Sequence, residues 1–195
     1  MPSGRTREFD TDHALDQALR LFWRKGYEGT SLSDLTDAMG ITKPSLYAAF
    51  GNKEALFHLI LDRYVQGPAA YLHEVLGEPT ARGVVERFLC SALDAQTDPH
   101  TPAGCLLVQG ALACGDNAAS IKAALIARRK VAELALSQRL EQAQAEGDLP
   151  ASADPASLAR YVSTLSQGMA VQAASGVDRE QLLQMIETAL QAWPT

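Results

Sequence analysis

The sequence has few of the residues that metal sites, disulfide-rich folds and membrane segments require. Its three cysteines, Cys90, Cys105 and Cys114, are odd in number and form no Cys-x-x-Cys pair, which argues against a disulfide framework and a zinc site. No apolar run approaches the roughly 20 residues of a membrane span. The first residues are polar and lack the apolar core of a signal peptide. We therefore expect a cytoplasmic protein with no membrane partner.

Catalytic signatures are also missing. The chain contains no glycine-rich phosphate loop, no Gly-x-Ser-x-Gly elbow and no His-Glu-x-x-His motif. The four histidines are scattered along the chain and fit surface or core positions better than ligand or base positions. We predict no enzyme activity, no catalytic residue, no metal and no cofactor. An enzyme on a helical scaffold would need a convergent polar site in a C-terminal pocket.

The composition is otherwise that of an ordinary globular protein, with 47% apolar and 21% charged residues in 195. The net charge of −6 is unevenly spread. Residues 1–64 hold eight basic and nine acidic side chains, for −1, and the remainder holds nine and fourteen, for −5. The acidity therefore lies mostly outside the N-terminal third. A nucleic-acid surface there would need its basic side chains gathered on one face.

The stretch 30–56 carries the strongest local signals. Ser31 has the residue type of a helix N-cap, and Asp34 stands three positions later, where a carboxylate can complete a capping box. Gly40 supplies a left-handed helix end, and Thr42 is the next N-cap. Two short helices joined by such a turn form a helix-turn-helix.

The second of these helices has two distinct faces. Leu46 and Phe50 mark its buried side. Its outer side carries small, hydroxylated or basic side chains, which suit close approach to phosphates and base edges: Thr42, Lys43, Ser45 and Ala48. An αα corner of an ordinary helical domain would show the same local pattern.

The residue types across this region resemble the DNA-binding domain of the TetR/AcrR family of bacterial regulators. The resemblance covers about the first 64 residues and rests on Phe22, Gly26, Tyr27, Thr30, Ser31, Leu35, Ala38, Gly40, Ile41, Thr42, Ser45, Leu46, Tyr47, Phe50, Lys53, Glu54, Ala55 and Leu56. Ala49 departs from it, because the family often has His or Tyr there, facing the phosphate backbone.

The resemblance implies sequence-specific binding of palindromic double-stranded operator DNA. The residues expected to bind DNA are Thr30, Ser31, Thr42, Lys43, Pro44, Ser45, Tyr47 and Lys53. Arg5 and Arg7 make the first residues a candidate basic arm for phosphate or the minor groove. A chain terminus that touches nothing is the alternative for these two residues.

Helical periodicity continues to the end of the chain, and no strand alternation stands out. We predict an all-α fold with a three-helix DNA-binding domain at 1–51, a connecting helix from 52, and a C-terminal ligand-binding and dimerisation bundle at 52–195. A helix over 52–76 should kink or break at Gly67-Pro68. Apolar spacing places Leu59 and Leu134 on buried faces and leaves Trp23 partly exposed.

The last two predicted helices, 156–174 and 179–193, have apolar stripes flanked by small residues. The resemblance implies that they pair with their symmetry mates in a homodimer through a four-helix interface. Gly168 would then lie at a close helix crossing. Periodicity alone fits the core of a monomer equally well.

An apolar cavity for a small-molecule effector is expected between the C-terminal helices. Its expected lining is Tyr64, Phe88, Cys105, Tyr161 and Met169. The basic cluster at 128–130 is assigned to a solvated face. Cys105 follows Pro102-Ala103-Gly104, so a helix start could lower its thiol pKa and make it a sensor of electrophiles. An inert small hydrophobe is the commoner role for such a cysteine.

We therefore predict a transcriptional regulator, specifically a repressor that a small molecule releases from its operator. The effector would favour a spacing of the two DNA-binding domains that fits the two half-sites badly, which is a population shift. A helical ligand- or protein-binding module that does not bind DNA is the alternative, and the near-neutral N-terminal third and Ala49 favour it.

Overall fold

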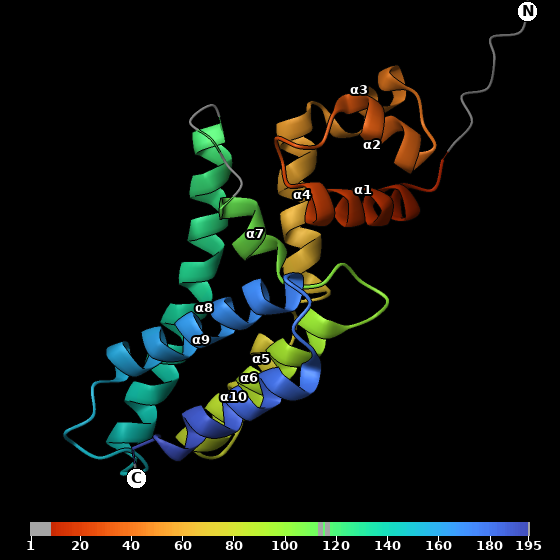
Figure 1. Cartoon of the computed structure of the whole chain (residues 1–195). Coiled ribbons are helices and arrows are strands. Elements are labelled where there is room, and N and C mark those ends of the chain that lie inside the picture. Colours follow the sequence, from red (N-terminus) through yellow and green to blue (C-terminus); the bar gives the residue numbers. More distant parts are fainter. Residues whose placement is uncertain (1–8, 113–114, 116–117, 195) are drawn as a thin grey trace, which may run out of the picture.

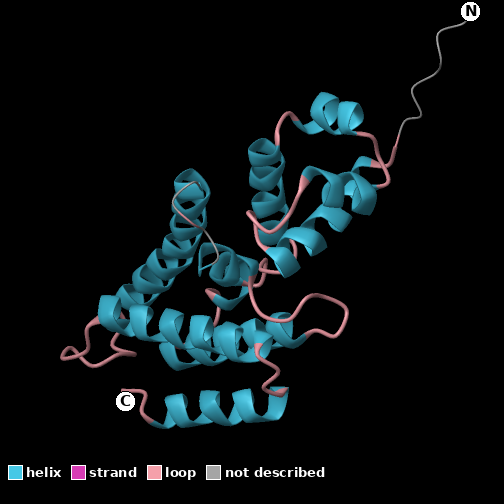
Figure 2. Ribbon diagram, turned by 45° about the horizontal axis from the view of Figure 1, so that its top comes forward, coloured by secondary structure: helices cyan, strands magenta, loops and turns pink. Residues whose placement is uncertain are grey.

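The computed structural model describes residues 9–112, 115 and 118–194. This part of the chain is helical throughout, with loops and no strand (Figure 2). The predicted all-α fold is therefore confirmed. None of the described helices is both long and apolar enough to cross a bilayer.

Four helices form the N-terminal part, shown in red to orange in Figure 1. They are α1 (Thr11–Lys25), α2 (Leu32–Met39), α3 (Lys43–Phe50) and α4 (Lys53–Gln66). Six more follow: α5 (Leu72–Val75), α6 (Ala81–Thr97), α7 (Leu106–Leu112), α8 (Ala119–Ala145), α9 (Pro155–Ala174) and α10 (Arg179–Gln191). Figure 1 shows α4 running from the N-terminal helices down to the C-terminal ones.

The chain breaks where the sequence places Gly67-Pro68. Helix α4 ends at Gln66, and the Gly67 amide donates to the carbonyl of Arg63 at 3.0 Å. Pro68 has no N–H for a further helical bond and its ring disfavours a continuing helix. Only the single turn of α5 forms before the next loop. The span 52–76 is therefore two helices, and the C-terminal end of α4 is the part that meets the C-terminal helices.

A first hydrophobic core unites α1 to α4 with α7 and the start of α8. Its centre is aromatic: the Phe57 ring lies edge-on to the rings of Phe22 and Tyr27, with centroids 4.9 and 5.1 Å apart. Trp23 is buried there, edge-on to Tyr64 at 4.9 Å, so the expectation that it is partly exposed is wrong. It lies off the α1 stripe that faces α2, and α4 covers it from the other side.

A second core lies between α6, α8, α9 and α10. Helix α9 packs on α8 and α6, and α10 packs on α6. The fully buried side chains at its centre come from three of these helices: Val84, Leu89, Leu93, Leu136, Leu140, Val162 and Met169.

Two leucines expected in the core are exposed. On α4 the buried side is formed by Leu56, Phe57, Ile60, Leu61 and Tyr64, which turns Leu59 outward with 44% of its surface exposed. On α8 the buried stripe passes through Leu136 and Leu140, and Leu134 points to solvent. Both expectations failed because apolar residues occur on more than one face of these helices.

Replacing Phe57 by Ala tests the aromatic centre of the first core. Because Phe57 is fully buried, the substitution should lower the free energy of unfolding by about 3–5 kcal/mol. Leu59→Ala, two residues along the same helix, should change it by less than about 0.5 kcal/mol. Urea unfolding followed by circular dichroism measures both. Equal losses in the two variants would contradict this packing.

Candidate DNA-binding surface and effector cavity

Local hydrogen bonds build the helix-turn-helix as the sequence predicts. The Asp34 amide donates to the Ser31 hydroxyl at 3.0 Å, and the Asp34 carboxylate accepts from the Ser31 amide at 2.9 Å. This completes the predicted capping box. Gly40 ends α2 in the left-handed conformation, with φ 66°. These contacts set the direction in which α3 leaves the turn.

Helix α3 turns its inner residues into the core and its outer residues to solvent. Leu46 and Phe50 are buried, while Lys43, Pro44 and Tyr47 are exposed. The Thr42 hydroxyl caps the helix by accepting from the Ser45 amide at 3.3 Å, and the two hydroxyls lie 2.9 Å apart. Five of the predicted DNA-binding residues therefore share one surface: Thr42, Lys43, Pro44, Ser45 and Tyr47.

Thr30 does not belong to this surface. It is fully buried, and its hydroxyl donates to the carbonyl of Gly26 at 2.7 Å. A side chain held in this way supports the turn after α1 and has no free face for DNA, so its assignment as a DNA contact is corrected. Ser31 is exposed, with its hydroxyl engaged in the capping box.

The carboxylate of Asp34 stays charged at any pH at which the protein would be used. Its pKa is lowered to about 2, first by the hydrogen bond from the Ser31 amide and then by the bond from Lys25 at 3.1 Å. The negative charge therefore sits at the N-terminus of α2, where the helix dipole favours it.

Lys53 lies at the N-terminus of α4, where Asn52 caps the helix. Its ammonium lies 4.3 Å from the centre of the Tyr27 ring, in a cation–π contact. Partial burial lowers the Lys53 pKa, opposed by the nearby charge of Glu28. Arg5 and Arg7, the other predicted basic contacts, lie outside the described residues.

A cavity of about 120 Å³ lies inside the C-terminal part, where the end of α4 meets α6, α7, α8 and α9. Tyr64, Phe88 and Cys105 line it, as expected from the sequence. Met169 instead lies fully buried in the second core. Tyr161 is 43% exposed on the outer side of α9, beside a separate shallow hollow. Helix α9 contributes side chains to the second core, to the cavity and to solvent, and its spacing alone did not separate those faces.

The sequence assignment missed the polar part of this lining. Arg128 and Arg129, placed on a solvated face, both line the cavity, with Gln96 and Gln167. A signal for Arg129 was present: it falls four residues after Leu125, on the stripe of α8 that is otherwise buried. The neighbouring Arg128 forms an ion pair with Asp62 of α4.

Cys105 is held in the cavity wall by Tyr64, whose hydroxyl donates to its sulfur at 3.2 Å. Burial raises the pKa of the Cys105 thiol above its usual value; the Tyr64 hydrogen bond, backbone amides of α7 and the charge of Arg129 oppose this shift without cancelling it. Burial likewise raises the pKa of Tyr64 strongly. The lowered thiol pKa expected from a helix start is therefore wrong, because burial outweighs the dipole.

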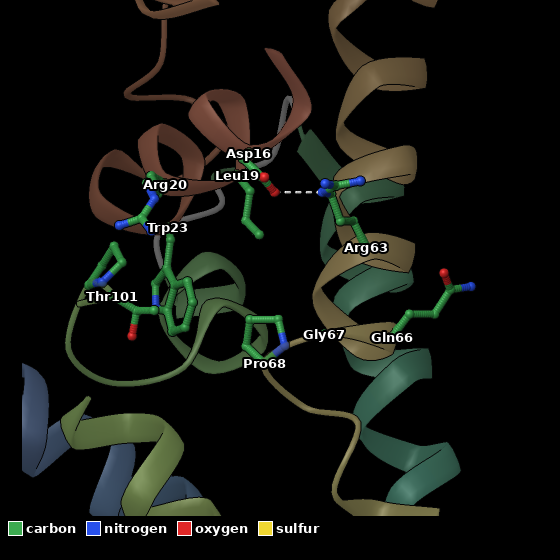
Figure 3. Close-up of a pocket in the computed structure, with 10 residues that line it drawn as sticks. Asp16, Leu19, Arg20, Trp23, Arg63, Gln66, Gly67, Pro68 and Thr101 are labelled. Atoms are coloured by element: carbon green, nitrogen blue, oxygen red, sulfur yellow. Dashed lines mark hydrogen bonds and ion pairs between the residues drawn. The ribbon is translucent and has the colours of Figure 1, made fainter. Parts of the chain in front are cut away.

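A second hollow, of about 410 Å³, lies at the junction of α1, the end of α4 and the loop after α6. Figure 3 shows Trp23 and Leu19 on one side of it and Pro68 below. Arg63 crosses from α4 to α1, with its Nε 2.7 Å from Asp16 and an Nη 2.9 Å from Asp12. Arg20 of α1 donates to the carbonyl of His100 in the loop. The hollow therefore marks where the N-terminal helices rest on the C-terminal part.

Comparison with known proteins matches both parts of this architecture. Residues 14–60 match the family described as bacterial regulatory proteins, tetR family, and residues 82–192 match the tetracyclin repressor-like C-terminal domain. The chain belongs to the TetR family. The predicted resemblance is confirmed, and the protein, like other members of the family, is a DNA-binding transcriptional regulator.

Relatives within the family match almost the whole chain. The HTH-type transcriptional repressor ComR of Escherichia coli is 38% identical over 194 residues, which cover 98% of this chain and 92% of ComR. A cysteine-substituted TetR family regulator CifR, solved with 26-bp double-strand operator DNA, is 42% identical with a TM-score of 0.93, covering 97% of this chain and 100% of CifR. A putative TetR regulator from Rhodococcus is 44% identical with a TM-score of 0.64, covering 95% and 99% of the two chains.

The raised pKa of Cys105 predicts a thiol that reacts slowly with alkylating reagents. In a Cys90→Ser, Cys114→Ser variant, Cys105 should react with iodoacetamide at pH 7.5 more slowly than free cysteine, because less of it is thiolate. Intact-mass spectrometry over time gives the rate. Tyr64→Phe removes the hydroxyl that stabilises the thiolate and should slow the reaction further. A rate above that of free cysteine would support the electrophile-sensor hypothesis instead.

Proposed function

We propose that this protein is a cytoplasmic, homodimeric repressor that binds palindromic operator DNA and releases it when a small molecule fills the cavity beside Cys105. The observation that carries the proposal is the exposed face of α3, fixed by the Ser31 and Thr42 caps. Support also comes from the similarity to ComR, a transcriptional repressor, and to CifR, which was solved with operator DNA.

On this proposal α3 is the recognition helix and enters the major groove. Lys43, in its first turn, is placed to reach a base edge or a phosphate. Thr42 and Tyr47 flank it and are placed to contact the phosphate backbone on either side. Lys53 adds its charge to the free amides at the start of α4.

Dimerisation would use α9 and α10. The exposed side of α9 forms a continuous stripe at helical spacing: Tyr161, Thr164, Gly168 and Val171. A Cβ added at Gly168 would meet nothing within 4 Å in the single chain. A stripe with a glycine at its centre and apolar residues at both ends suits close packing against a second copy. Two recognition helices would then face adjacent major grooves.

The release signal would pass through Tyr64. Its hydroxyl contacts Cys105 in the cavity wall, and its ring contacts Trp23 of α1. A ligand that shifts Tyr64 would also shift the end of α4, and with it the N-terminal helices joined through Arg63. The size of the response depends on how much better the ligand binds the released arrangement.

The alternative, a helical module that no longer binds DNA, is favoured by the net charge of −1 over residues 1–64. Electrophoretic mobility shift of genomic fragments at low salt separates the two. The repressor proposal expects at least one fragment to shift at submicromolar protein and to be released by competing unlabelled fragment. A protein that shifts no fragment acts as the alternative describes.

Lys43→Ala tests the recognition helix. If Lys43 contacts a guanine, operator affinity should fall by about 1–3 kcal/mol. If it meets only phosphate, affinity should fall alike on all sequences, and the slope of log affinity against log salt should become shallower by about one. Fluorescence anisotropy over a salt series measures both. Lys130→Ala, exposed on α8, is the matched control and should bind as wild type; unchanged binding by Lys43→Ala would refute the role.

Gly168→Leu tests the dimer. Gly168 is exposed in the single chain, an added Cβ meets nothing within 4 Å, and leucine has a better helix propensity than glycine, so the fold should survive. A close helix crossing between two copies would not accommodate it. Sedimentation should show monomers, and operator binding should be lost. Ala123→Leu, exposed on α8, is the control that should remain dimeric; a dimeric Gly168→Leu would place the interface elsewhere.

A further inference from the structure

We infer that the cavity beside Cys105 takes a small organic anion, with a body about one ring in size, an anionic head at Arg129 and a hydrogen-bond donor at Gln96. This inference rests on the proposed function, because it names the chemical class of the effector of that same site. Charge, unmet hydrogen bonding and volume each point to this class.

The charge of the lining is positive. Among the described residues that line the cavity none is Asp or Glu, and two are arginines, Arg128 and Arg129. Asp62 neutralises Arg128. Arg129 forms no ion pair with a described residue, and its guanidinium bonds only the neutral amide oxygen of Gln167, at 3.3 Å. A partly buried guanidinium without an anion is unfavourable, and a carboxylate matches its fork of donors.

The amide oxygen of Gln96 has no hydrogen-bond donor among the described residues. Gln96 is only 4% exposed, and its side-chain N–H donates to the carbonyl of Ser166 at 3.1 Å. Its amide oxygen is buried without a partner. A buried acceptor left unpaired costs roughly 1–3 kcal/mol, so a ligand hydroxyl or N–H at this position would be favoured.

The two polar groups stand at opposite depths. Arg129 is half-buried, and Val131 beside it is 64% exposed, which marks the mouth between α4 and α8. Gln96 comes from the buried side of α6. Both bond consecutive residues of α9, Ser166 and Gln167. A ligand would therefore lie with its anionic head at the mouth and its donor inward.

The volume and the apolar walls set the body between these ends. Cavities of about 150 Å³ hold one benzene ring, and this one has about 120 Å³. Its apolar lining includes Leu72, Phe88 and Leu107. The space is therefore slightly smaller than a benzene-sized cavity, so it admits at most one ring or a short hydrocarbon, and larger fused systems do not fit.

An uncharged electrophile that alkylates Cys105 is the competing class. The raised pKa of that thiol makes it a poor nucleophile at neutral pH. An uncharged electrophile would also leave the charge of Arg129 without a counter-ion. The reversible anion satisfies both unmet groups without a covalent step.

The test uses 4-hydroxybenzoate and its neutral isostere 4-hydroxybenzamide with the full-length protein, by isothermal titration calorimetry and thermal shift. The acid should bind and raise the melting temperature, since a ligand that binds only the folded state stabilises it. The amide should bind about tenfold or more weakly, because hydrogen bonds to charged partners are the stronger ones. Benzoate, which lacks the donor for Gln96, should fall between 4-hydroxybenzoate and no ligand.

Two arginine variants show which guanidinium binds the anionic head of the ligand. Arg129→Gln should remove the preference for acid over amide, and Arg128→Gln, whose charge is already paired with Asp62, should keep it. If Arg129→Gln does not fold, the acid–amide comparison on the wild-type protein still decides. The inference is overturned if the amide binds as well as the acid, if Arg129→Gln keeps the preference, or if neither compound binds at about 10 mM, ten times the Kd of a millimolar ligand.

Failure of the ligand class and failure of the proposed function give different results. Binding is measured without DNA, and the mobility-shift assay is then repeated with 4-hydroxybenzoate. Arg129-dependent binding of the acid with no effect on the DNA complex would uphold the class and refute ligand release. Release of DNA by the amide and the acid alike would uphold ligand release and refute the class.

Discussion

The edge-on contact between Trp23 and Tyr64 joins the part of the molecule that faces DNA to the part that encloses the cavity. The ring centroids lie 4.9 Å apart, and Tyr64 is almost fully buried. On its far side the Tyr64 hydroxyl reaches the sulfur of Cys105. One side chain is thus packed against α1 and hydrogen-bonded to the residue that precedes α7. Close-packed interiors transmit small displacements because they have little free volume to absorb them.

Ion pairs near this contact also join α4 to its neighbours on both parts of the molecule. Arg63 bonds Asp12 and Asp16 of α1, so α1 and α4 are tied near one end of the junction hollow. Arg128 ties α8 to Asp62, one residue earlier on α4. Pairs this exposed add little to stability, but they contact α4 from two directions, because Asp62 and Arg63 are consecutive residues and point to neighbouring faces of the helix. Helix α4 is therefore held between the DNA-facing helices and the cavity wall.

Local chemistry was the part of the structure that the sequence predicted well. The caps at Ser31 and Thr42 and the helix end at Gly40 depend on residues three or four positions apart, so residue type and spacing were sufficient. Thr30 was misassigned because its hydroxyl serves a carbonyl in the preceding turn, which the family pattern does not reveal. The faces of Leu59 and Leu134 depend on which neighbours each helix meets. The polar lining of the cavity was missed for a different reason: Arg129 was interpreted by its charged neighbours, although its spacing from Leu125 already placed it on the buried stripe of α8.

The first hydrophobic core does not stop at the predicted boundary between residues 51 and 52. Leu106 of α7 and Ile121 and Leu125 of α8 pack in the same cluster as Phe22 and Leu35. The DNA-reading helices thus share their interior with the start of the effector-binding helices, so they are poor candidates for an exchangeable module. In a chimera of helices α1 to α4 with the C-terminal helices of a relative, the first hydrophobic core would be mismatched. It would stay matched only if α7 and the first turns of α8 were transferred together with α1 to α4. Within this architecture, the helix-turn-helix and two of the helices that line the cavity, α7 and α8, stand on one common set of buried side chains.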